Sequence, residues 1–141
     1  MTVNSEKPCI LIADDTRKTR DLIRLFYDEY DFDLIEAVNG REAVELAREC
    51  SPDLILLDLQ MPVMNGCEAA VILKNDKSVK DIPLLFMTGQ AFAEETERLS
   101  GMSDGYLTKP FQQADLIHAT MQCLPDLLQK PGPDAQTEIM Q

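Results

Sequence analysis

Residues 53–58 read Asp-Leu-Ile-Leu-Leu-Asp, a continuous apolar run between two carboxylates. A strand that is apolar at every position, rather than at every second one, is typical of a sheet that is buried on both faces. Such sheets are almost always parallel and carry helices on each side. The stretch therefore predicts an α/β fold in which Asp58 stands where this buried strand ends.

Similar apolar runs alternate with amphipathic segments on both sides of this strand. Strands are predicted at residues 9–13, 32–37, 53–58, 82–87 and 106–107. Helices, in which apolar residues recur with the helical period, are predicted at 16–30, 41–50, around Ala69 to Leu73, at 91–99 and at 112–124. Five strands alternating with five helices predict a doubly wound parallel sheet between two layers of helices.

Length and charge limit both the architecture and the partners. The 141 residues suit one domain, and 13 Lys+Arg against 25 Asp+Glu give a net charge of −12. A nucleic-acid-binding surface needs basic residues that neutralise phosphates, and an anionic membrane attracts basic segments in the same way. We therefore expect no direct nucleic-acid partner and no membrane partner. Cations, or proteins with basic patches, are the expected ones.

Cysteine usage and the two ends of the chain indicate the compartment and the domain limits. Cys9, Cys50, Cys67 and Cys123 are scattered without a C-x-x-C pair. Buried thiols in a reducing cytosol explain them better than disulfides, although their number allows disulfides. The N-terminus is polar and does not resemble a signal peptide, so together with the cysteines it predicts a cytoplasmic protein. The periodic pattern covers residues 7–124, and 125–141 are expected to form a disordered tail.

Polar residues end the predicted strands on one side of the sheet. Asp14 and Asp15 follow the first apolar run, Asp58 ends the third, Thr88 follows the fourth and Lys109 lies just past the fifth. Each has an ordinary explanation as a helix cap, a turn residue or a solvated lysine. Their joint position is more specific, because parallel strands bring their carboxyl ends to one edge, where such folds bind ligands.

Converging carboxylates repel one another unless cations compensate them. Mg²⁺ accepts one or two carboxylates together with a phosphoryl oxygen, and Lys109 supplies a fixed positive charge. A carboxylate beside a metal ion, a lysine and a hydroxyl is a reasonable nucleophile toward phosphorus, and it would form an aspartyl phosphate. Mg²⁺, the Thr88 hydroxyl and the Lys109 ammonium would then each stabilise one phosphoryl oxygen.

At this point the sequence resembles the receiver domains of two-component response regulators. The matching pieces are Asp14-Asp15, LILLDLQMPVMNG around Asp58, LLFMTG with Thr88, and GYLTKPF with Tyr106, Lys109 and Pro110. The resemblance extends over about residues 7–124, which is nearly all of the chain that is expected to be ordered. The resemblance implies a flavodoxin-like sheet with strand order 2-1-3-4-5.

The resemblance also implies the phosphoacceptor and its metal ligands. Asp58 would receive a phosphoryl group from the phosphohistidine of a sensor histidine kinase or a histidine phosphotransfer protein. Asp15 and Asp58 would bind Mg²⁺ directly, with the backbone carbonyl of Gln60 as a third ligand. Asp14 would act on the ion through water.

A conformational switch is implied as well. On phosphorylation the Thr88 hydroxyl would move to the phosphoryl group, and the Tyr106 ring would turn inward to fill the vacated space. A downstream protein would dock near the fourth helix, the fifth strand and the fifth helix. The resemblance further predicts that the Lys109–Pro110 peptide is cis. A peptide bond that precedes proline adopts this isomer at a low cost in free energy.

Two other functions are considered from the residues. A Mg²⁺-dependent phosphatase of the haloacid-dehalogenase-like group would need a second Asp two residues after the nucleophile, where this chain has Gln60. A nucleotide or flavin binder would need a Gly-rich loop after the first strand, where Asp14-Asp15 would repel phosphate. We therefore expect a signalling phosphoacceptor rather than an enzyme, either a stand-alone receiver or a piece of a larger response regulator or hybrid kinase.

Overall fold

The computed structural model describes residues 7–89 and 100–125. The strands are β1 Cys9–Ala13, β2 Asp33–Ala37, β3 Leu54–Asp58, β4 Leu84–Gly89 and β5 Gly105–Lys109. The helices are α1 Arg17–Phe26, α2 Gly40–Cys50, α3 Gly66–Lys74, α5 Gln113–Cys123 and the short 3₁₀ helix η2 Ser100–Met102. Within this part of the chain, no helix is long and apolar enough to cross a membrane.

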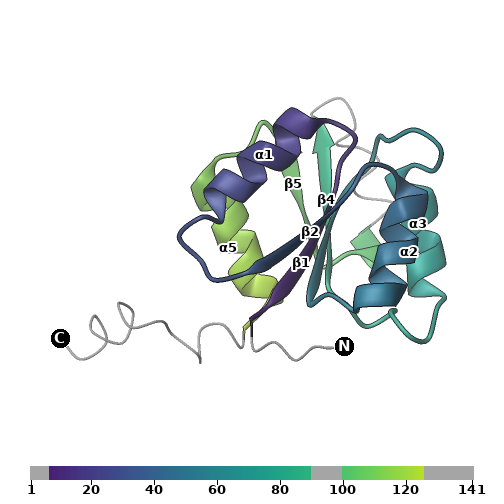
Figure 1. Cartoon of the computed structure of the whole chain (residues 1–141). Helices are drawn as coiled ribbons and strands as arrows, with labels where there is room; N and C mark the ends of the chain where they lie inside the picture. The colour runs from purple at the N-terminus through teal and green to yellow at the C-terminus, as the bar shows by residue number, and fades with distance from the viewer. Residues whose placement is uncertain (1–6, 90–99, 126–141) are drawn as a thin grey trace.

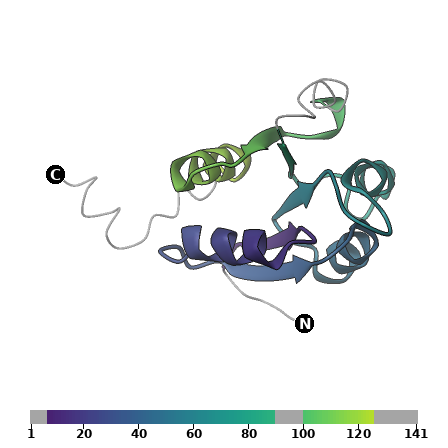
Figure 2. The ribbon, with the colours of Figure 1, turned by 90° about the horizontal axis from the view of Figure 1, so that it is seen from above.

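The strands form one parallel sheet in the order β2-β1-β3-β4-β5, which confirms the predicted fold and strand order. Helices α1 and α5 cover one face of the sheet, and α2 and α3 cover the other (Figures 1 and 2). The predicted helix at 91–99 lies outside the described residues, as does the predicted tail apart from Pro125.

Two hydrophobic cores, one on each face, follow from the continuous apolar strands. In β1, Leu11 and Ala13 pack into the core beneath α2 and α3, whereas Ile10 and Ile12 pack beneath α1 and α5. All five residues of β3 are buried, as the sequence of this strand predicts. Each fully buried Leu or Ile contributes about 1.5–3 kcal/mol, so this central strand anchors both layers.

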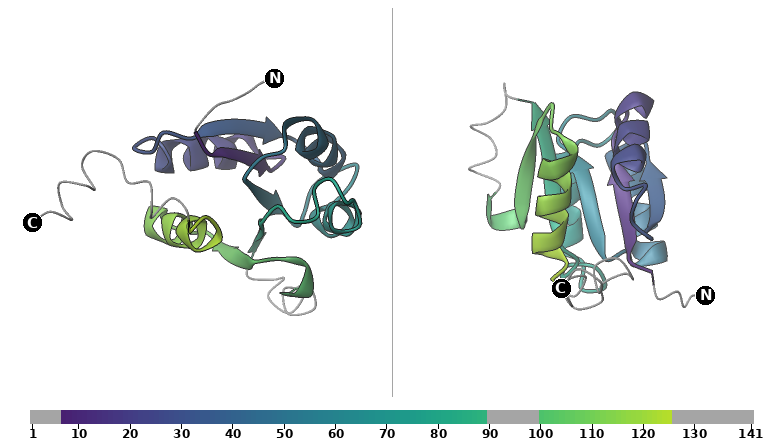
Figure 3. Two further views of the ribbon diagram at one scale, coloured as in Figure 1. Left: turned by 90° about the horizontal axis from the view of Figure 1, so that it is seen from below. Right: turned by 90° about the vertical axis from the view of Figure 1, so that its left-hand side faces the viewer.

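Helices α1 and α5 are tied to each other on their shared face of the sheet (Figure 3, right). The Tyr27 hydroxyl, just after α1, and the Thr120 hydroxyl of α5 are 2.7 Å apart and both buried. The Gln113 amide donates a hydrogen bond to the Phe26 carbonyl at 3.0 Å. These contacts hold α1, the helix that follows β1, against α5, the helix that follows β5.

Some element limits differ from the prediction. The first helix ends at Phe26 rather than at residue 30, because the chain turns there: the Tyr27 carbonyl accepts a hydrogen bond from the Tyr30 N–H instead of continuing the helix. The fourth strand begins at Leu84 rather than at residue 82, because Pro83 has no N–H to donate to the sheet. The strand ends at Gly89 rather than at residue 87, so Thr88 lies inside the strand and not after it.

Candidate functional site

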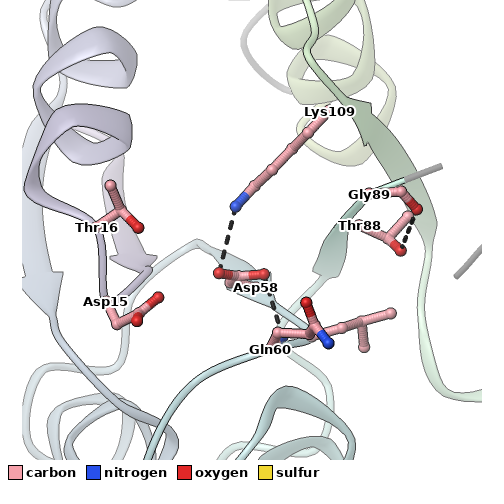
Figure 4. A pocket seen from close by; sticks show the side chains of 8 residues that line it. Asp15, Thr16, Asp58, Gln60, Thr88, Gly89 and Lys109 are labelled. Atoms are coloured by element: carbon pink, nitrogen blue, oxygen red, sulfur yellow. Dashed lines mark hydrogen bonds and ion pairs between the residues drawn. The ribbon is translucent and has the colours of Figure 1, made fainter. Parts of the chain in front are cut away.

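Two buried carboxylates and one lysine meet at the carboxyl edge of the sheet. Asp14 directly follows β1 and is fully buried, and Asp58 ends β3 and is 6% exposed. The Lys109 ammonium, at the end of β5, lies 2.8 Å from Asp14 Oδ2 and 3.3 Å from Asp58 Oδ2. Figure 4 shows the Lys109 side chain extending toward Asp58. One cation thus bridges carboxylates from two neighbouring strands.

Asp15 adds a third carboxylate to this group. Asp14, Asp15 and Asp58 each offer an oxygen atom, and these atoms all lie within 4.8 Å of one another. Three carboxylates against the single ammonium of Lys109 leave two negative charges without a partner among these groups. Hard oxygen donors with this excess charge fit a divalent cation such as Mg²⁺.

A cavity of about 340 Å³ opens beside these groups. Asp15 and Asp58 face each other across it, and Gln60 lies at its rim next to Asp58 (Figure 4). The residues that line it are Asp15, Thr16, Asp58, Leu59, Gln60, Thr88, Gly89 and Lys109. Its size and polar lining suit a small charged group rather than an apolar ligand.

Burial and charge shift the ionisation of the central pair. Burial, together with the charge of Asp14, raises the pKa of Asp58 from 3.8 to about 6, against the opposing effects of Lys109 and of the Gln60 N–H. For Lys109, burial lowers the pKa, but the contacts with Asp14 and Asp58 outweigh it and the pKa is raised. At neutral pH the site therefore holds an ionised, unusually basic carboxylate beside a charged lysine.

The two acidic residues after β1 differ in their contacts. Asp14 Oδ1 accepts a hydrogen bond from the Thr16 N–H at 2.8 Å, while Oδ2 accepts from Lys109. Thr16 is the N-cap residue of α1, but its side chain makes no capping hydrogen bond. Asp15 is exposed and its carboxylate contacts no hydrogen-bond partner in the described segments. Asp14 is thus held within the protein, whereas Asp15 is available to a ligand.

Two glycines place the loop that follows Asp58. A Cβ on Gly66, the first residue of α3, would lie 2.2 Å from the Asp58 carbonyl oxygen. A Cβ on Gly40, the first residue of α2, would lie 2.2 Å from the Met64 carbonyl oxygen. Only glycine permits both approaches, so the loop that carries Gln60 packs directly against two helix starts. Gly66 is the last residue of the LILLDLQMPVMNG stretch, and only the fold shows what it packs against.

The two predicted switch residues lie apart from the charged group. Thr88 is buried at the cavity wall, and its hydroxyl donates to the Gly89 carbonyl at 3.1 Å rather than to Asp58 (Figure 4). Tyr106 of β5 is 49% exposed and does not line the cavity. The Lys109–Pro110 peptide is cis, as expected. The predicted residues therefore gather at one edge, except that Tyr106 stands outside the cavity.

One contributor to this region was missed from the sequence. Arg20 of α1 donates a hydrogen bond from Nη1 to the Asp14 carbonyl oxygen at 2.8 Å. In the sequence Arg20 is one of four basic residues between positions 17 and 24. Nothing in the residue pattern distinguishes it from the other three, because only the fold places its side chain behind the acidic pair.

Comparison with known proteins identifies the family. The sequence profile of the response regulator receiver domain matches residues 10–121. The transcriptional regulatory protein SrrA of Staphylococcus aureus is 37% identical over 111 residues, which cover 77% of this chain and 44% of SrrA. The autoinducer 1 sensor kinase/phosphatase LuxN of Vibrio campbellii is 33% identical over 116 residues, which cover 82% of this chain and 13% of LuxN.

A solved structure agrees in fold. The chemotaxis protein CheY4 of Vibrio cholerae superposes with a TM-score of 0.76 at 25% identity, covering 83% of this chain and 98% of CheY4. The chain belongs to the response regulator receiver domain family. It is a phosphoacceptor module of two-component signalling, related both to a transcriptional regulator and to a sensor kinase. It spans less than half the length of those two relatives.

Proposed function

We propose that Asp58 is the phosphoacceptor of this receiver domain and that the reaction depends on Mg²⁺. The observation that carries the proposal is the contact of the Lys109 ammonium with both Asp58 and the buried Asp14, beside a cavity that Asp15 also lines. The proposed donor is a phosphohistidine of a sensor histidine kinase or a histidine phosphotransfer protein. The kinship with LuxN, which is named a sensor kinase, supports such a donor.

The proposed transfer is an in-line displacement at phosphorus. A carboxylate oxygen of Asp58 forms the new bond to phosphorus while the bond to the donor's imidazole nitrogen breaks, and the imidazole leaves with the electron pair. Lys109, already 3.3 Å from Asp58, would stabilise the negative charge on one phosphoryl oxygen.

The proposed metal ligands are the side chains of Asp15 and Asp58 and the backbone carbonyl of Gln60, with Asp14 acting through water. Mg²⁺, when bound, would supply charge neutralisation for the incoming phosphoryl group. The carboxylate of Asp15, which has no hydrogen-bond partner among residues 7–89 and 100–125, and the two uncompensated negative charges of the group support this assignment. Both carboxylate oxygens of Asp14 already accept hydrogen bonds, from the Thr16 N–H and from Lys109, which supports a contact with the ion through water rather than direct ligation.

Thr88 and Tyr106 are proposed as the switch. Within the described part of the chain, the Thr88 hydroxyl hydrogen-bonds to the carbonyl of the next residue alone, so a phosphoryl group on Asp58 offers it a charged and therefore stronger acceptor. The half-exposed ring of Tyr106 has room to change its rotamer. A downstream protein would read the change near residues 91–99, β5 and α5.

We also propose a cytoplasmic location, residues 7–124 as the receiver domain, and catalysis by the domain of its own phosphorylation and dephosphorylation only. The four cysteines form no disulfide, which supports a reducing compartment. They are less buried than the sequence pattern suggested: Cys9, Cys67 and Cys123 are partly buried and Cys50 is exposed.

Phosphorylation with a small-molecule phosphodonor and Mg²⁺, followed by intact-mass measurement, tests the proposal. We expect a mass gain of one phosphoryl group in the wild type and in Asp81→Asn, and none in Asp58→Asn. Asp81 is an exposed aspartate that precedes β4 at the opposite edge of the sheet, so its variant controls for nonspecific modification. Repeated turnover of a phosphomonoester without accumulation of phosphoprotein would favour the phosphatase alternative.

A further inference from the structure

Arg20 contacts the acidic site from behind, through the backbone. Its side chain is only 12% exposed and reaches from α1 toward the end of β1. Nη1 donates to the Asp14 carbonyl oxygen at 2.8 Å, and Nε donates to Glu36 Oε1 of β2 at 2.7 Å. A guanidinium group fits both acceptors at once, because its donors are arranged in a rigid plane.

The Asp14 carbonyl that Arg20 holds belongs to the peptide bond between Asp14 and Asp15. Strand β1 ends at Ala13. The last backbone hydrogen bond to β2 is donated by the Asp14 N–H to the Ala37 carbonyl, at 3.0 Å. Beyond this point the sheet no longer fixes the chain. The Arg20 hydrogen bond therefore sets the orientation of the peptide plane from which Asp15 departs.

Asp15 depends on its backbone for its direction. Its carboxylate makes no hydrogen bond or ion pair with the described residues, yet one of its oxygens lies within 4.8 Å of carboxylate oxygens of Asp14 and Asp58. We propose that Arg20 is a positioning residue that orients Asp15 toward Mg²⁺ by fixing the Asp14–Asp15 peptide, with Glu36 holding the guanidinium. This inference rests on the proposed function, because it takes Asp15 as a metal ligand.

The same helix provides a matched control. Arg24 lies one turn after Arg20 and its Nε also pairs with Glu36, at the other carboxylate oxygen. Nothing bonds Arg24 to the Asp14 carbonyl, however, whereas Arg20 reaches both groups. Loss of Arg24 removes a similar ion pair without touching the peptide that carries Asp15.

The charge of Arg20 acts in the opposite direction from its proposed role. A guanidinium that is hydrogen-bonded to the Asp14 backbone carbonyl repels a cation bound at the acidic site, so removing it would strengthen Mg²⁺ binding if charge alone mattered. Loss of positioning would weaken Mg²⁺ binding, since partners that orient metal ligands are typically worth about 10- to 100-fold in metal affinity. The sign of the change therefore separates the two effects.

The test is a titration with Mg²⁺ alone, followed by amide chemical shifts in NMR spectra, for the wild type, Arg20→Met, Arg20→Lys, Arg24→Met and Asp15→Asn. We expect Arg20→Met to weaken Mg²⁺ binding about tenfold, near the lower end of that range. Arg20→Lys should weaken it less, because one ammonium cannot reproduce the planar fork. Arg24→Met should stay within about twofold of the wild type.

Equal or tighter Mg²⁺ binding by both Arg20 variants would overturn the inference, as would an equal loss in Arg24→Met. The spectra themselves report whether each variant is folded, and the lysine variant covers the case in which the methionine variant does not fold. If Asp15→Asn bound Mg²⁺ as tightly as the wild type does, the proposed metal site itself would be contradicted. The two failures are therefore distinguishable.

Discussion

The candidate site has an acidic half and a switch half, and they are built differently. The acidic half consists of Asp14, Asp15 and Asp58 with Lys109, in which both buried carboxylates already contact the lysine. The switch half consists of Thr88 and Tyr106, and the side-chain hydrogen bond that it shows within the described residues joins the Thr88 hydroxyl to the carbonyl of its neighbour Gly89. Buried charges require fixed partners, whereas a neutral hydroxyl and a half-exposed ring leave little free energy to lose when they move.

The two halves therefore have different roles in the proposed reaction and switch. The acidic half is organised before any phosphoryl group arrives, because Lys109 and the Arg20 contact hold its carboxylates and backbone in place. The switch half has contacts that a new acceptor on Asp58 can outcompete. Variants of each half should therefore affect different measurements.

The largest expected effect follows from breaking the acidic half at its cation. Lys109→Met leaves Asp14 and Asp58 without their shared partner and removes a group that stabilises the transferring phosphoryl. We expect phosphorylation by a small phosphodonor at saturating Mg²⁺ to slow by about 100-fold, since losing one such stabilising group costs about 10²–10³ in rate. A time course of intact mass measures it. Lys77→Met, an exposed lysine at the opposite sheet edge, is the control, and a Lys109→Met rate within about fivefold of wild type would contradict the assignment.

Next in size is the support behind the acidic half. Gly66→Ala forces a Cβ to within 2.2 Å of the Asp58 carbonyl oxygen, so α3 or the end of β3 must shift. We expect the free energy of unfolding to fall by about 1–3 kcal/mol in urea titrations. Gly101→Ala is the matched control, because nothing lies within 4 Å of its added Cβ. Equal stability of the two variants would show that the loop relaxes without cost.

A pH series sharpens the electrostatic part of the comparison. The pKa of Asp58 is raised from 3.8 to about 6, so the folded protein binds this proton more tightly than the unfolded chain does. Its stabilising contribution is complete below the unfolded pKa and is lost as the pH rises through about 6.

Asp58→Asn removes this dependence. In metal-free buffer we expect the variant to be more stable than the wild type by about 1–2 kcal/mol near about pH 8, with the difference disappearing near about pH 4. Urea midpoints with a chelator across this range measure it, with Asp81→Asn as the reference. A stability difference that does not change with pH would show that burial does not disfavour the ionised carboxylate.

The smallest effect is expected in the switch half. Thr88→Val keeps the shape of the side chain but removes the hydroxyl, which makes one neutral hydrogen bond. We expect a loss of less than about 1 kcal/mol in unfolding free energy and a Mg²⁺ affinity within about twofold of wild type. Binding of a downstream partner should no longer respond to phosphorylation. A Mg²⁺ affinity loss as large as that of Asp15→Asn would place Thr88 in the acidic half instead.

Much of the site was predictable because parallel strands impose one simple rule. The apolar run at 53–58 predicted a doubly covered strand, and the alternation around it predicted the parallel sheet. In such a sheet every strand ends at the same edge, which placed Asp14, Asp58 and Lys109 at that edge although they lie far apart in the sequence. That they meet there depends on the strand order, which the resemblance to receiver domains supplied. Periodicity and strand ends are local properties, and they are written in residue types.

The tertiary structure decided which group bonds to which. Asp14 and Asp15 are equivalent neighbours in the sequence, yet one is buried between Thr16 and Lys109 and the other faces the cavity. Arg20 and Arg24 are equally basic, yet only the first reaches the peptide behind the acidic pair. Such differences depend on how each helix is rotated and placed against the strand ends. The spacing of residue types does not determine this placement, because two side chains of the same kind can form the same contacts until packing brings only one of them within reach.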